Sequence, residues 1–338
     1  MQKHGGNIRA FAQEIGCNED EVIDLSSNIN VVKPKIDIDF NQINISSYPT
    51  YDKLYQAIAT QYKLKSSQIE LFNGATVGIH TLFRELKLKH CTLYAPLYGE
   101  YAHSAKSYGY EIELINRFTN LDQEVKENSF VIFVNPSTPD GKFYNIESLM
   151  KRWIDKNCTI LIDESFLDFT PYESAIQYIE HYDKLYILKS MTKFYSSAGM
   201  RIGAIFSNRN SIKELNAKEP LWKISEFDSQ YLQSALRDKN FIQRSNQINR
   251  QHYQQTIDIL IKKPWVKKIY PSSVNFILIE LQQITSQELQ EALHPYKVMI
   301  RECGNFDFLD NHFVRIAIKT EKGIDILKRF HYNSIKKG

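Results

Sequence analysis

The residues best suited to chemistry stand in one short run, Ser190-Met191-Thr192-Lys193, with Arg201 eight residues after the lysine. The run follows an apolar stretch at residues 185–188 that predicts a buried strand, and ligands of open α/β sheets bind beyond the carboxyl ends of strands. Two small hydroxyls, a lysine and an arginine in such a place suit a cofactor phosphate and a reactive amine. A lone lysine after a strand is most often a surface residue, so this interpretation depends on the residues around it.

Three further segments offer partners for such a cofactor. Asp163 ends another apolar run; its carboxylate would pair a protonated ring nitrogen, with a helix N-cap or a surface acid as the equal alternative. Asn73-Gly74-Ala75-Thr76 leads into a helical pattern, where backbone N–H groups would bind phosphate, although Asn-Gly is also an ordinary turn. Tyr98 follows a further apolar run and would stack on a flat ring, unless it is simply one of 20 tyrosines in the core or on the surface.

The elements that must position these residues alternate between short apolar runs and helical patterns. Apolar side chains recur with helical spacing at residues 75–88 and 145–156, which predicts two helices. Strands buried on both faces are expected at residues 92–96, 131–135, 159–163, 185–188 and 203–206. Strands separated by helices indicate βαβ units and a mostly parallel sheet.

The last third of the chain has a different pattern. Residues 223–263 are mostly polar and predict long helices, and a short helix at 287–294 separates strands expected at 273–280 and 313–318. We therefore predict three parts along the chain. They are an irregular N-terminal arm (1–40) that packs on the small domain, a large domain (41–225) and a smaller α+β domain (226–338).

Composition narrows the class of protein. The chain has 338 residues, 43% of them apolar, and a formal charge of +3, which suggests neither a nucleic-acid nor a membrane partner. Its four cysteines share no C-x-x-C spacing, so neither a metal site nor a disulfide framework is expected, and Cys91 and Cys158 are expected to be small buried residues. The sequence has no secretion signal and no apolar run near the roughly 20 residues of a membrane helix, so we expect a cytoplasmic protein.

Taken in order, these segments resemble the aspartate aminotransferase superfamily, the fold-type I enzymes that depend on pyridoxal 5′-phosphate (PLP). The resemblance covers nearly the whole chain and implies an α/β fold, with a large domain around a mostly parallel sheet and a smaller α+β domain. The segments that carry it are Asn73-Gly74-Ala75-Thr76, Pro139-Asp140-Gly141, Asp163-Glu164, Ser190-Met191-Thr192-Lys193, Gly199-Met200-Arg201-Ile202-Gly203 and Val314-Arg315-Ile316.

Within this superfamily the chain is similar to histidinol-phosphate aminotransferases and, more closely, to the decarboxylases of L-threonine O-3-phosphate that serve cobalamin biosynthesis. The second resemblance implies decarboxylation of O-phosphothreonine or O-phosphoserine to the amino-alcohol phosphate of the cobamide nucleotide loop. Transamination of the histidinol-phosphate type is the alternative, and a silent binding protein of the same fold is a third. The decarboxylase-like segments are His4-Gly5-Gly6-Asn7-Ile8-Arg9, Leu25-Ser26-Ser27-Asn28-Ile29-Asn30, Asp163-Glu164-Ser165-Phe166 and Thr192-Lys193-Phe194-Tyr195.

The resemblance also implies a role for each site residue. Lys193 forms a Schiff base with PLP, Asp163 pairs with its ring nitrogen and Tyr98 stacks on its ring. Tyr48 reaches the cofactor phosphate of a neighbouring subunit, which implies a homodimer with shared sites. Residues around the cofactor phosphate are Gly74, Ala75, Thr76, Ser190, Thr192 and Arg201; residues that contact the substrate are His4, Asn7, Asn28, Arg301 and Arg315.

Two positions depart from the usual aminotransferase pattern. Thr138 stands where the family usually has an asparagine that hydrogen-bonds the cofactor's phenolic oxygen, and Phe166 stands where many aminotransferases have a tyrosine. We also expect the segment from His4 to Asn7 to fold over the site and help to bind a substrate phosphate, because its glycine pair lets backbone N–H groups approach an anion.

Overall fold

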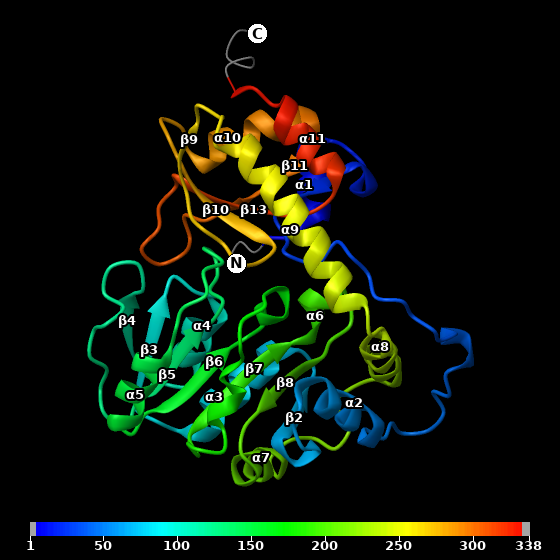
Figure 1. The fold of residues 1–338 in the computed structure, drawn as a ribbon, viewed down its shortest axis with the longest axis vertical. Coiled ribbons are helices and arrows are strands. Elements are labelled where there is room, and N and C mark those ends of the chain that lie inside the picture. The colour runs from blue at the N-terminus through cyan, green and yellow to red at the C-terminus, as the bar shows by residue number, and fades with distance from the viewer. Residues whose placement is uncertain (1–4, 333–338) are drawn as a thin grey trace.

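The computed structural model describes residues 5–332, and its largest element is a seven-stranded sheet with the order β2-β8-β7-β6-β5-β3-β4 (Figure 1). Strand β8 is antiparallel to both of its neighbours, and the other adjacent strands are parallel. This is the mostly parallel sheet that the sequence predicts. The strands are β2 (Ile69–Phe72), β3 (His90–Ala95), β4 (Glu111–Asn116), β5 (Phe130–Val134), β6 (Thr159–Asp163), β7 (Leu185–Ser190) and β8 (Gly203–Phe206).

Side chains fill both faces of this sheet. In β5, Val131 and Phe133 join the core on one face, while Phe130 and Ile132 join the core on the other. Because both faces are buried, the central strands appear in the sequence as continuous apolar runs and not as alternating apolar and polar residues. The helices associated with the sheet are α2 (Asp52–Tyr62), α3 (Ala75–Leu86), α4 (Glu100–Ser107), α5 (Glu147–Asp155), α6 (Met191–Phe194) and α7 (Arg209–Asn216).

The five strands predicted in this region are confirmed, with ends that differ by at most two residues, and so are the two helices. Strands β2 and β4 were not predicted. β4 lies at the sheet edge with mostly exposed or half-buried residues, so it lacks a continuous apolar run. β2 contains Glu70, a buried carboxylate that forms an ion pair with Lys223, and this charge interrupts the apolar pattern.

A smaller unit follows, built on an antiparallel sheet of four strands in the order β12-β13-β10-β9. In Figure 1 the long helix α9 runs from beside the large sheet up to this unit, and the predicted helices and strands of this part are confirmed. Helix α8 (Glu226–Arg237) packs beside α2 (Figure 1), and its Leu232 and Ala235 join the core of the large sheet. The elements that follow are α9 (Phe241–Leu260), β9 (Val266–Ile269), β10 (Phe276–Leu281), α10 (Ser286–Leu293), β12 (Arg301–Glu302), β13 (Phe313–Ala317) and α11 (Glu321–Arg329).

The N-terminal arm is more ordered than the sequence predicts. It contains helix α1 (Ile8–Ile15) and the short strand β1 (Ile23–Asp24), which pairs in parallel with β11 (Val298–Met299). Leu25 joins the apolar core around the four-stranded sheet. The expectation of wholly irregular structure over residues 1–40 is therefore wrong for these two segments, whereas the domain boundaries at 40/41 and 225/226 stay predictions.

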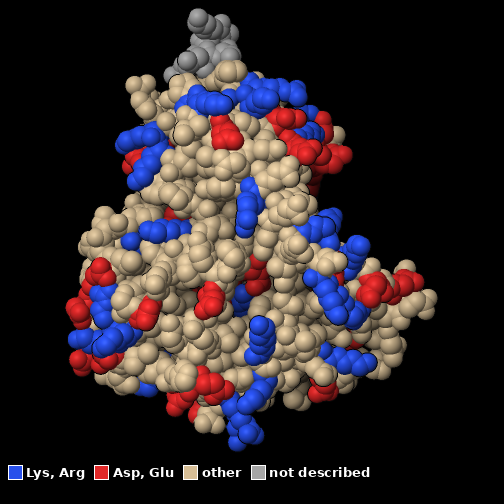
Figure 2. Space-filling view, viewed as in Figure 1, with Lys and Arg blue, Asp and Glu red and all other residues tan. Residues whose placement is uncertain are grey.

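The distribution of surface charge (Figure 2) and the burial of two cysteines agree with what the composition predicts. On the face drawn in Figure 2, basic and acidic side chains are interspersed, so no large area of one sign is visible there. Cys91 and Cys158 are buried free thiols, as predicted. Within residues 5–332, no helix combines the length and the apolar character that crossing a bilayer requires.

Candidate active site

Lys193 lies in α6, the short helix that begins immediately after β7 at the carboxyl end of the parallel strands. Its Nζ lies 5.5 Å from the centre of the Phe166 ring. Burial lowers the pKa of Lys193 below the ordinary lysine value, and the Asp163 carboxylate only partly opposes this effect. A lowered pKa leaves more of the amine neutral, the form that attacks a carbonyl group.

Asp163 ends the neighbouring strand β6, and its side chain is fixed by three donors. The Tyr101 hydroxyl donates to Oδ2 at 2.7 Å, while the backbone N–H and the hydroxyl of Ser165 donate to Oδ1 at 2.9 and 2.5 Å. These three hydrogen bonds fix the direction of the carboxylate. A fixed, buried carboxylate beside Lys193 suits a protonated ring nitrogen.

The start of α3 packs closely against Arg201, a predicted phosphate residue, and against Gly203 of strand β8. Gly74 has φ +84°, and a Cβ atom there would stand 2.6 Å from Nη2 of Arg201. A Cβ atom on Gly203 would stand 2.3 Å from the backbone nitrogen of Ala75. Only glycine therefore allows the guanidinium and strand β8 to approach the helix N-terminus so closely. The result is a cationic group beside the N-terminus of a helix, an arrangement that binds phosphate.

Hydroxyl groups lie next to this helix start. Ser190 pairs with Gly203 across β7 and β8, and its Oγ lies 2.9 Å from Oγ1 of Thr192. Thr76 hydrogen-bonds the hydroxyl of Tyr98, whose pKa is raised chiefly by burial. Thus Gly74, Ala75, Thr76, Ser190, Thr192 and Arg201 gather at one place, with Tyr98 beside them. Their small side chains, hydroxyls and guanidinium fit the phosphate end of PLP.

Arg315 extends from β13 toward the large sheet. Its Nη1 donates to Oγ1 of Thr138 at 3.0 Å, and its Nη2 donates to the carbonyl of Ser26 at 3.0 Å. Its Nε is buried without an acceptor in the described chain. Burial lowers the pKa of Arg315 to about 10, so the guanidinium remains charged at neutral pH. A buried cation with one unused donor suits a substrate carboxylate.

Residues 26–30 connect the Lys193 region to Arg315. The backbone N–H of Asn30 donates to the carbonyl of Lys193 at 3.0 Å, whereas Ser26 accepts from Arg315 at the other end. Asn28 lies between them and is buried, with its carbonyl bonded by the Asn275 side chain at 3.0 Å. The segment predicted to contain a substrate residue therefore spans the space between the two proposed functional groups.

Two phenylalanine rings line the same space. The Phe166 ring, below the Lys193 amine, packs edge to face on Phe276 with ring centres 5.1 Å apart. The Arg315 guanidinium lies 5.0 Å from the centre of Phe276. Lys193 thus contacts the first of these two rings and Arg315 contacts the second, and neither ring carries a hydroxyl.

The N-terminal segment approaches this region from outside. The backbone N–H of Gly6 donates at 2.7 Å to the hydroxyl of Ser26, the residue whose carbonyl accepts from Arg315. Asn7 caps α1 by accepting from the Ala10 N–H at 3.2 Å. His4 lies outside the described residues. The segment is placed next to the site, but the Asn7 side chain is used in a helix cap.

Arg301 is near Arg315 but is engaged by its own loop. The two arginines pair across β12 and β13, and Nη2 of Arg301 donates to Asn305 at 2.8 Å while Nη1 bonds the carbonyl of Glu302. Burial lowers the pKa of Arg301 as well. Tyr48 does not join the cluster within one chain; it is exposed and stacks on Trp222 with ring centres 4.0 Å apart.

Four residues of this arrangement were not predicted from the sequence. Tyr101 and Ser165 hold Asp163, while Ser26 and Asn30 hold the connecting segment. Ser165 stands two residues after an aspartate, a spacing typical of local side-chain to backbone turns, so a signal was present. Tyr101 gave none, because its partner is 62 residues away in the sequence.

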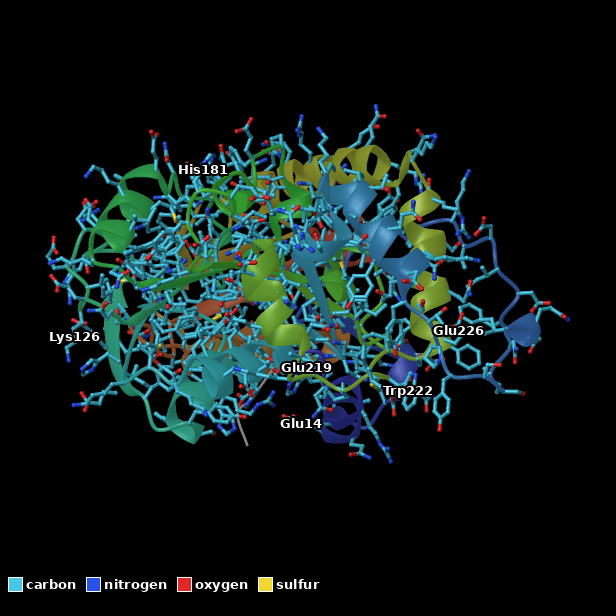
Figure 3. The ribbon with its side chains drawn as sticks, turned by 90° about the horizontal axis from the view of Figure 1, so that it is seen from below. Glu14, Lys126, His181, Glu219, Trp222 and Glu226 are labelled. Carbon is cyan, nitrogen blue, oxygen red and sulfur yellow. The ribbon has the colours of Figure 1, made fainter. Side chains whose placement is uncertain are left out.

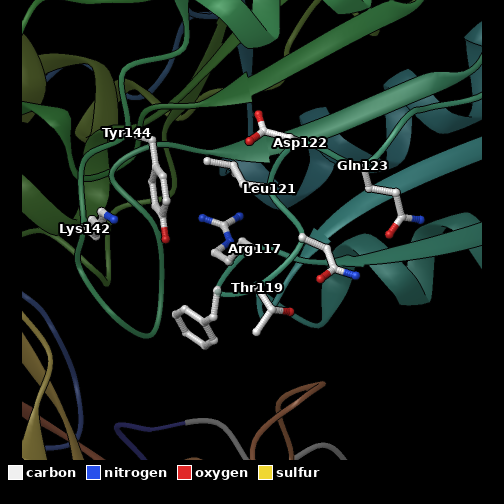
Figure 4. Close-up of a pocket in the computed structure, with 9 residues that line it drawn as sticks. Arg117, Thr119, Leu121, Asp122, Gln123, Lys142 and Tyr144 are labelled. Atoms are coloured by element: carbon white, nitrogen blue, oxygen red, sulfur yellow. The ribbon is translucent and has the colours of Figure 1, made fainter.

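A separate cavity of about 480 Å³ lies at the β4 side of the large sheet (Figure 4). Arg117, Lys142 and Tyr144 belong to its lining, and the loop at residues 118–123 forms the rest (Figure 4). Arg117 is held by the carbonyls of Tyr94 and Val134. The cavity shares no lining residue with the Lys193 cluster, so we assign the chemistry to the cluster and not to the cavity.

Known proteins resemble the chain along most of its length. The family described as aminotransferase class I and II matches residues 20–329. The chain is 26% identical to the threonine-phosphate decarboxylase of Salmonella typhimurium, over 94% of this chain and 92% of that protein. It is 28% identical to an L-serine phosphate decarboxylase of Campylobacter jejuni, over 83% and 77%. The histidinol-phosphate aminotransferase structure from Clostridium acetobutylicum matches with a TM-score of 0.82 and 30% identity, over 93% and 99%.

Proposed function

The chain belongs to the class I and II aminotransferase family, and from this premise we propose that it is a PLP-dependent decarboxylase of a small O-phosphorylated amino acid. The substrate is O-phosphothreonine or O-phosphoserine, and the product is the amino-alcohol phosphate. Two curated relatives with these substrates in their names support the proposal. One methyl group changes binding by only about 1–3 kcal/mol, so we expect both compounds to react.

The cluster described above would hold PLP. Lys193 would bind it covalently through Nζ, Asp163 would pair with the ring nitrogen, and Tyr98 would stack on the ring. The glycine-rich start of α3 with Arg201 would bind the phosphate. Thr138 can take part in two contacts at once, since its hydroxyl accepts from Arg315 and still has a proton to donate to the cofactor's phenolic oxygen.

When bound, PLP supplies the electron sink for the electron pair left as a bond to Cα breaks. The chain decides which bond that is by orienting the amino acid. Arg315 would bind the substrate carboxylate through its unused Nε–H, with Asn28 beside it. Lys193 would carry on Nζ the proton that Cα receives.

The substrate phosphate would need hydrogen-bond donors of its own. Arg301 is the nearest candidate, because it is the strand neighbour of Arg315 and a guanidinium binds phosphate with two parallel hydrogen bonds. It would have to exchange its Asn305 contact for the substrate. His4 and Asn7 of the N-terminal segment, together with Tyr48 of a second subunit, would complete the phosphate site. Deleting residues 1–8 should then raise the KM for a phosphorylated substrate sharply, and an unchanged KM would disprove their role.

The observation that carries the decarboxylase proposal is the Phe166 ring below the Lys193 amine. Many aminotransferases place a tyrosine hydroxyl there, and the decarboxylases that this chain resembles have phenylalanine. The alternative is transamination of histidinol phosphate, which the 30% identity to an aminotransferase of known structure favours. Lys193, Asp163 and Arg315 would serve either reaction, so only the products distinguish the two.

The test is a product assay on the PLP-loaded protein with three substrates. O-phosphothreonine, O-phosphoserine, and histidinol phosphate with 2-oxoglutarate are incubated separately, and CO₂ and glutamate are both measured. CO₂ from a phosphorylated amino acid without glutamate supports the proposal. Glutamate from histidinol phosphate without CO₂ from the other two would establish the alternative. The Lys193→Ala variant should form neither product.

We further propose that the protein acts as a homodimer with shared sites. Tyr48, Leu221 and Trp222 are large apolar side chains with exposed fractions of 72, 78 and 54%, and Trp222 is labelled in Figure 3. The carbonyl next to Trp222, on Lys223, accepts from the Asn73 side chain at 3.3 Å. This exposed aromatic patch therefore borders the turn that leads to the proposed phosphate site, where a second subunit would complete it. A place in the cytoplasm remains a prediction from the sequence.

Sedimentation analysis of two matched variants tests the dimer. Leu221→Asp places a charge in the patch and should give monomers with reduced activity. Ile261→Asp is the control, because Ile261 is also 69% exposed but lies at the end of α9. Equal sedimentation of both variants and the parent protein would refute this interface.

A further inference from the structure

Helices α3 and α4 bring together three side chains that the proposed reaction does not use. His80 lies in α3, while Glu100 and His103 are three residues apart in α4 and so share one face of that helix. One ligand atom from each lies within 4.8 Å of the other two. This is the one group of metal-binding side chains with such spacing found between residues 5 and 332.

The separation of the first two ligand atoms matches a zinc site. Bonds of about 2.0–2.1 Å at tetrahedral angles place two ligand atoms roughly 3.3–3.4 Å apart. His80 Nε2 lies 3.5 Å from Glu100 Oε2. An ion pair alone would explain this one distance. It would not explain a second imidazole in the same group, with the His80 and His103 ring centres 5.9 Å apart.

Exposure decides how the third ligand would move. His80 and Glu100 are partly buried, with 29 and 22% of their side chains exposed, whereas His103 is exposed. A rotation of the exposed His103 side chain would close its longer gap without moving either helix backbone. The exposed side of the group leaves room for water as a fourth ligand, the usual complement of three protein ligands.

We propose that His80, Glu100 and His103 bind a divalent metal ion of the zinc type. Two imidazoles and one carboxylate are ligands that zinc accepts, whereas magnesium and calcium prefer oxygen alone. The ion would join α3, six residues after Gly74, to the first turn of α4, where Glu100 stands two residues after Tyr98. Its role is to hold these two helices together, and the proposal does not depend on which reaction Lys193 performs.

Equilibrium dialysis of the untagged, PLP-loaded protein against Zn²⁺ tests the site, with bound metal measured directly. We expect one ion per chain at micromolar Zn²⁺ and a rise in the melting temperature, because a ligand that binds only the folded state stabilises it. His103→Ala should weaken binding by at least about 100-fold, since even the loss of an outer partner costs about 10–100-fold. Co²⁺ in the same site should give the intense visible bands of four-coordinate cobalt.

Two control variants exclude other sources of binding. His181→Ala removes an exposed histidine outside the group, and Cys17→Ser removes a partly exposed thiol. Both should bind one Zn²⁺ as the parent does. The proposal is overturned if the parent binds no Zn²⁺ at micromolar concentration, or if one ion is still bound with unchanged affinity in the His80→Ala/His103→Ala double variant.

Discussion

Replacing Thr138 by valine removes one hydrogen bond from Arg315 and leaves the shape of the side chain almost unchanged. Thr138 Oγ1 is the acceptor for Nη1, and both residues are 7% exposed. In the variant, the guanidinium keeps the Ser26 carbonyl at 3.0 Å but has two buried nitrogens without an acceptor in the described chain, Nη1 and Nε. We expect the guanidinium to turn away from the carboxylate position.

The size of the effect follows from the lost bond. A hydrogen bond to a charged group contributes about 1.5–3 kcal/mol. Each 1.36 kcal/mol is a factor of ten, so kcat/KM for the phosphorylated amino acid should fall roughly 10- to 150-fold. The larger part of this loss should be a rise in KM, because the Arg315 carboxylate contact already exists in the bound substrate. PLP content should fall less than kcat/KM does, since valine loses the proposed Thr138 contact to the cofactor but leaves Lys193 and the phosphate residues untouched.

The assay is steady-state CO₂ release with PLP stoichiometry and the unfolding midpoint measured on the same samples. Thr138→Ser keeps the hydroxyl and is the matched control; its kcat/KM should stay well above that of the valine variant, because the acceptor for Arg315 Nη1 is retained. Equal kcat/KM values for the valine and serine variants would refute the role assigned to the Thr138–Arg315 bond. A loss of PLP from the valine variant that matches its loss of kcat/KM would indicate that Thr138 acts chiefly through the cofactor and not through Arg315.

Three other perturbations test the account. Lys223→Met leaves the fully buried Glu70 without its cation and should lower the unfolding free energy, measured by urea titration, by about 3–5 kcal/mol. Adding Glu70→Gln should recover much of this loss. No recovery would show that the ion pair is not the cause. Gly203→Ala places a Cβ 2.3 Å from the first backbone nitrogen of α3, so it should lower the unfolding free energy by about 1–3 kcal/mol and reduce PLP content. Gly199→Ala is the control and should change neither quantity, because a Cβ at Gly199 meets open space. Because burial lowers the pKa of Lys193, the rate of PLP capture by the apoprotein should rise with pH through a midpoint below 10.5, and a midpoint at or above 10.5 would contradict the burial argument.

Local patterns were enough to predict the elements that carry Lys193 and Asp163. Both residues follow short apolar runs, and such runs are visible because both faces of the central strands are buried. The Asn73–Gly74 turn was also visible, because a glycine directly before a helical pattern marks the point where the backbone leaves the strand and enters the helix. The edge strand β4 was missed, since half of its surface is solvated and its pattern is mixed.

The rest of the site depends on contacts between distant parts of the chain. The bond from Tyr101 to Asp163 and the bond from Arg315 to Thr138, 177 residues apart, have no local signature. The Asn30 contact to the Lys193 carbonyl is of the same kind. Tyr48 illustrates a further limit, because the residue lies on the surface and its predicted partner belongs to a second subunit.

The most direct test of the central claim asks which bond to Cα breaks. The PLP-loaded protein is incubated with O-phosphothreonine or O-phosphoserine in D₂O, and substrate and product are analysed by mass spectrometry after return to water. The account predicts an amino-alcohol phosphate with one deuterium on the carbon that lost CO₂, placed there from the Lys193 amine, and substrate without deuterium. Deuterium at Cα of recovered substrate that keeps its carboxylate, with no amino-alcohol phosphate formed, would contradict it.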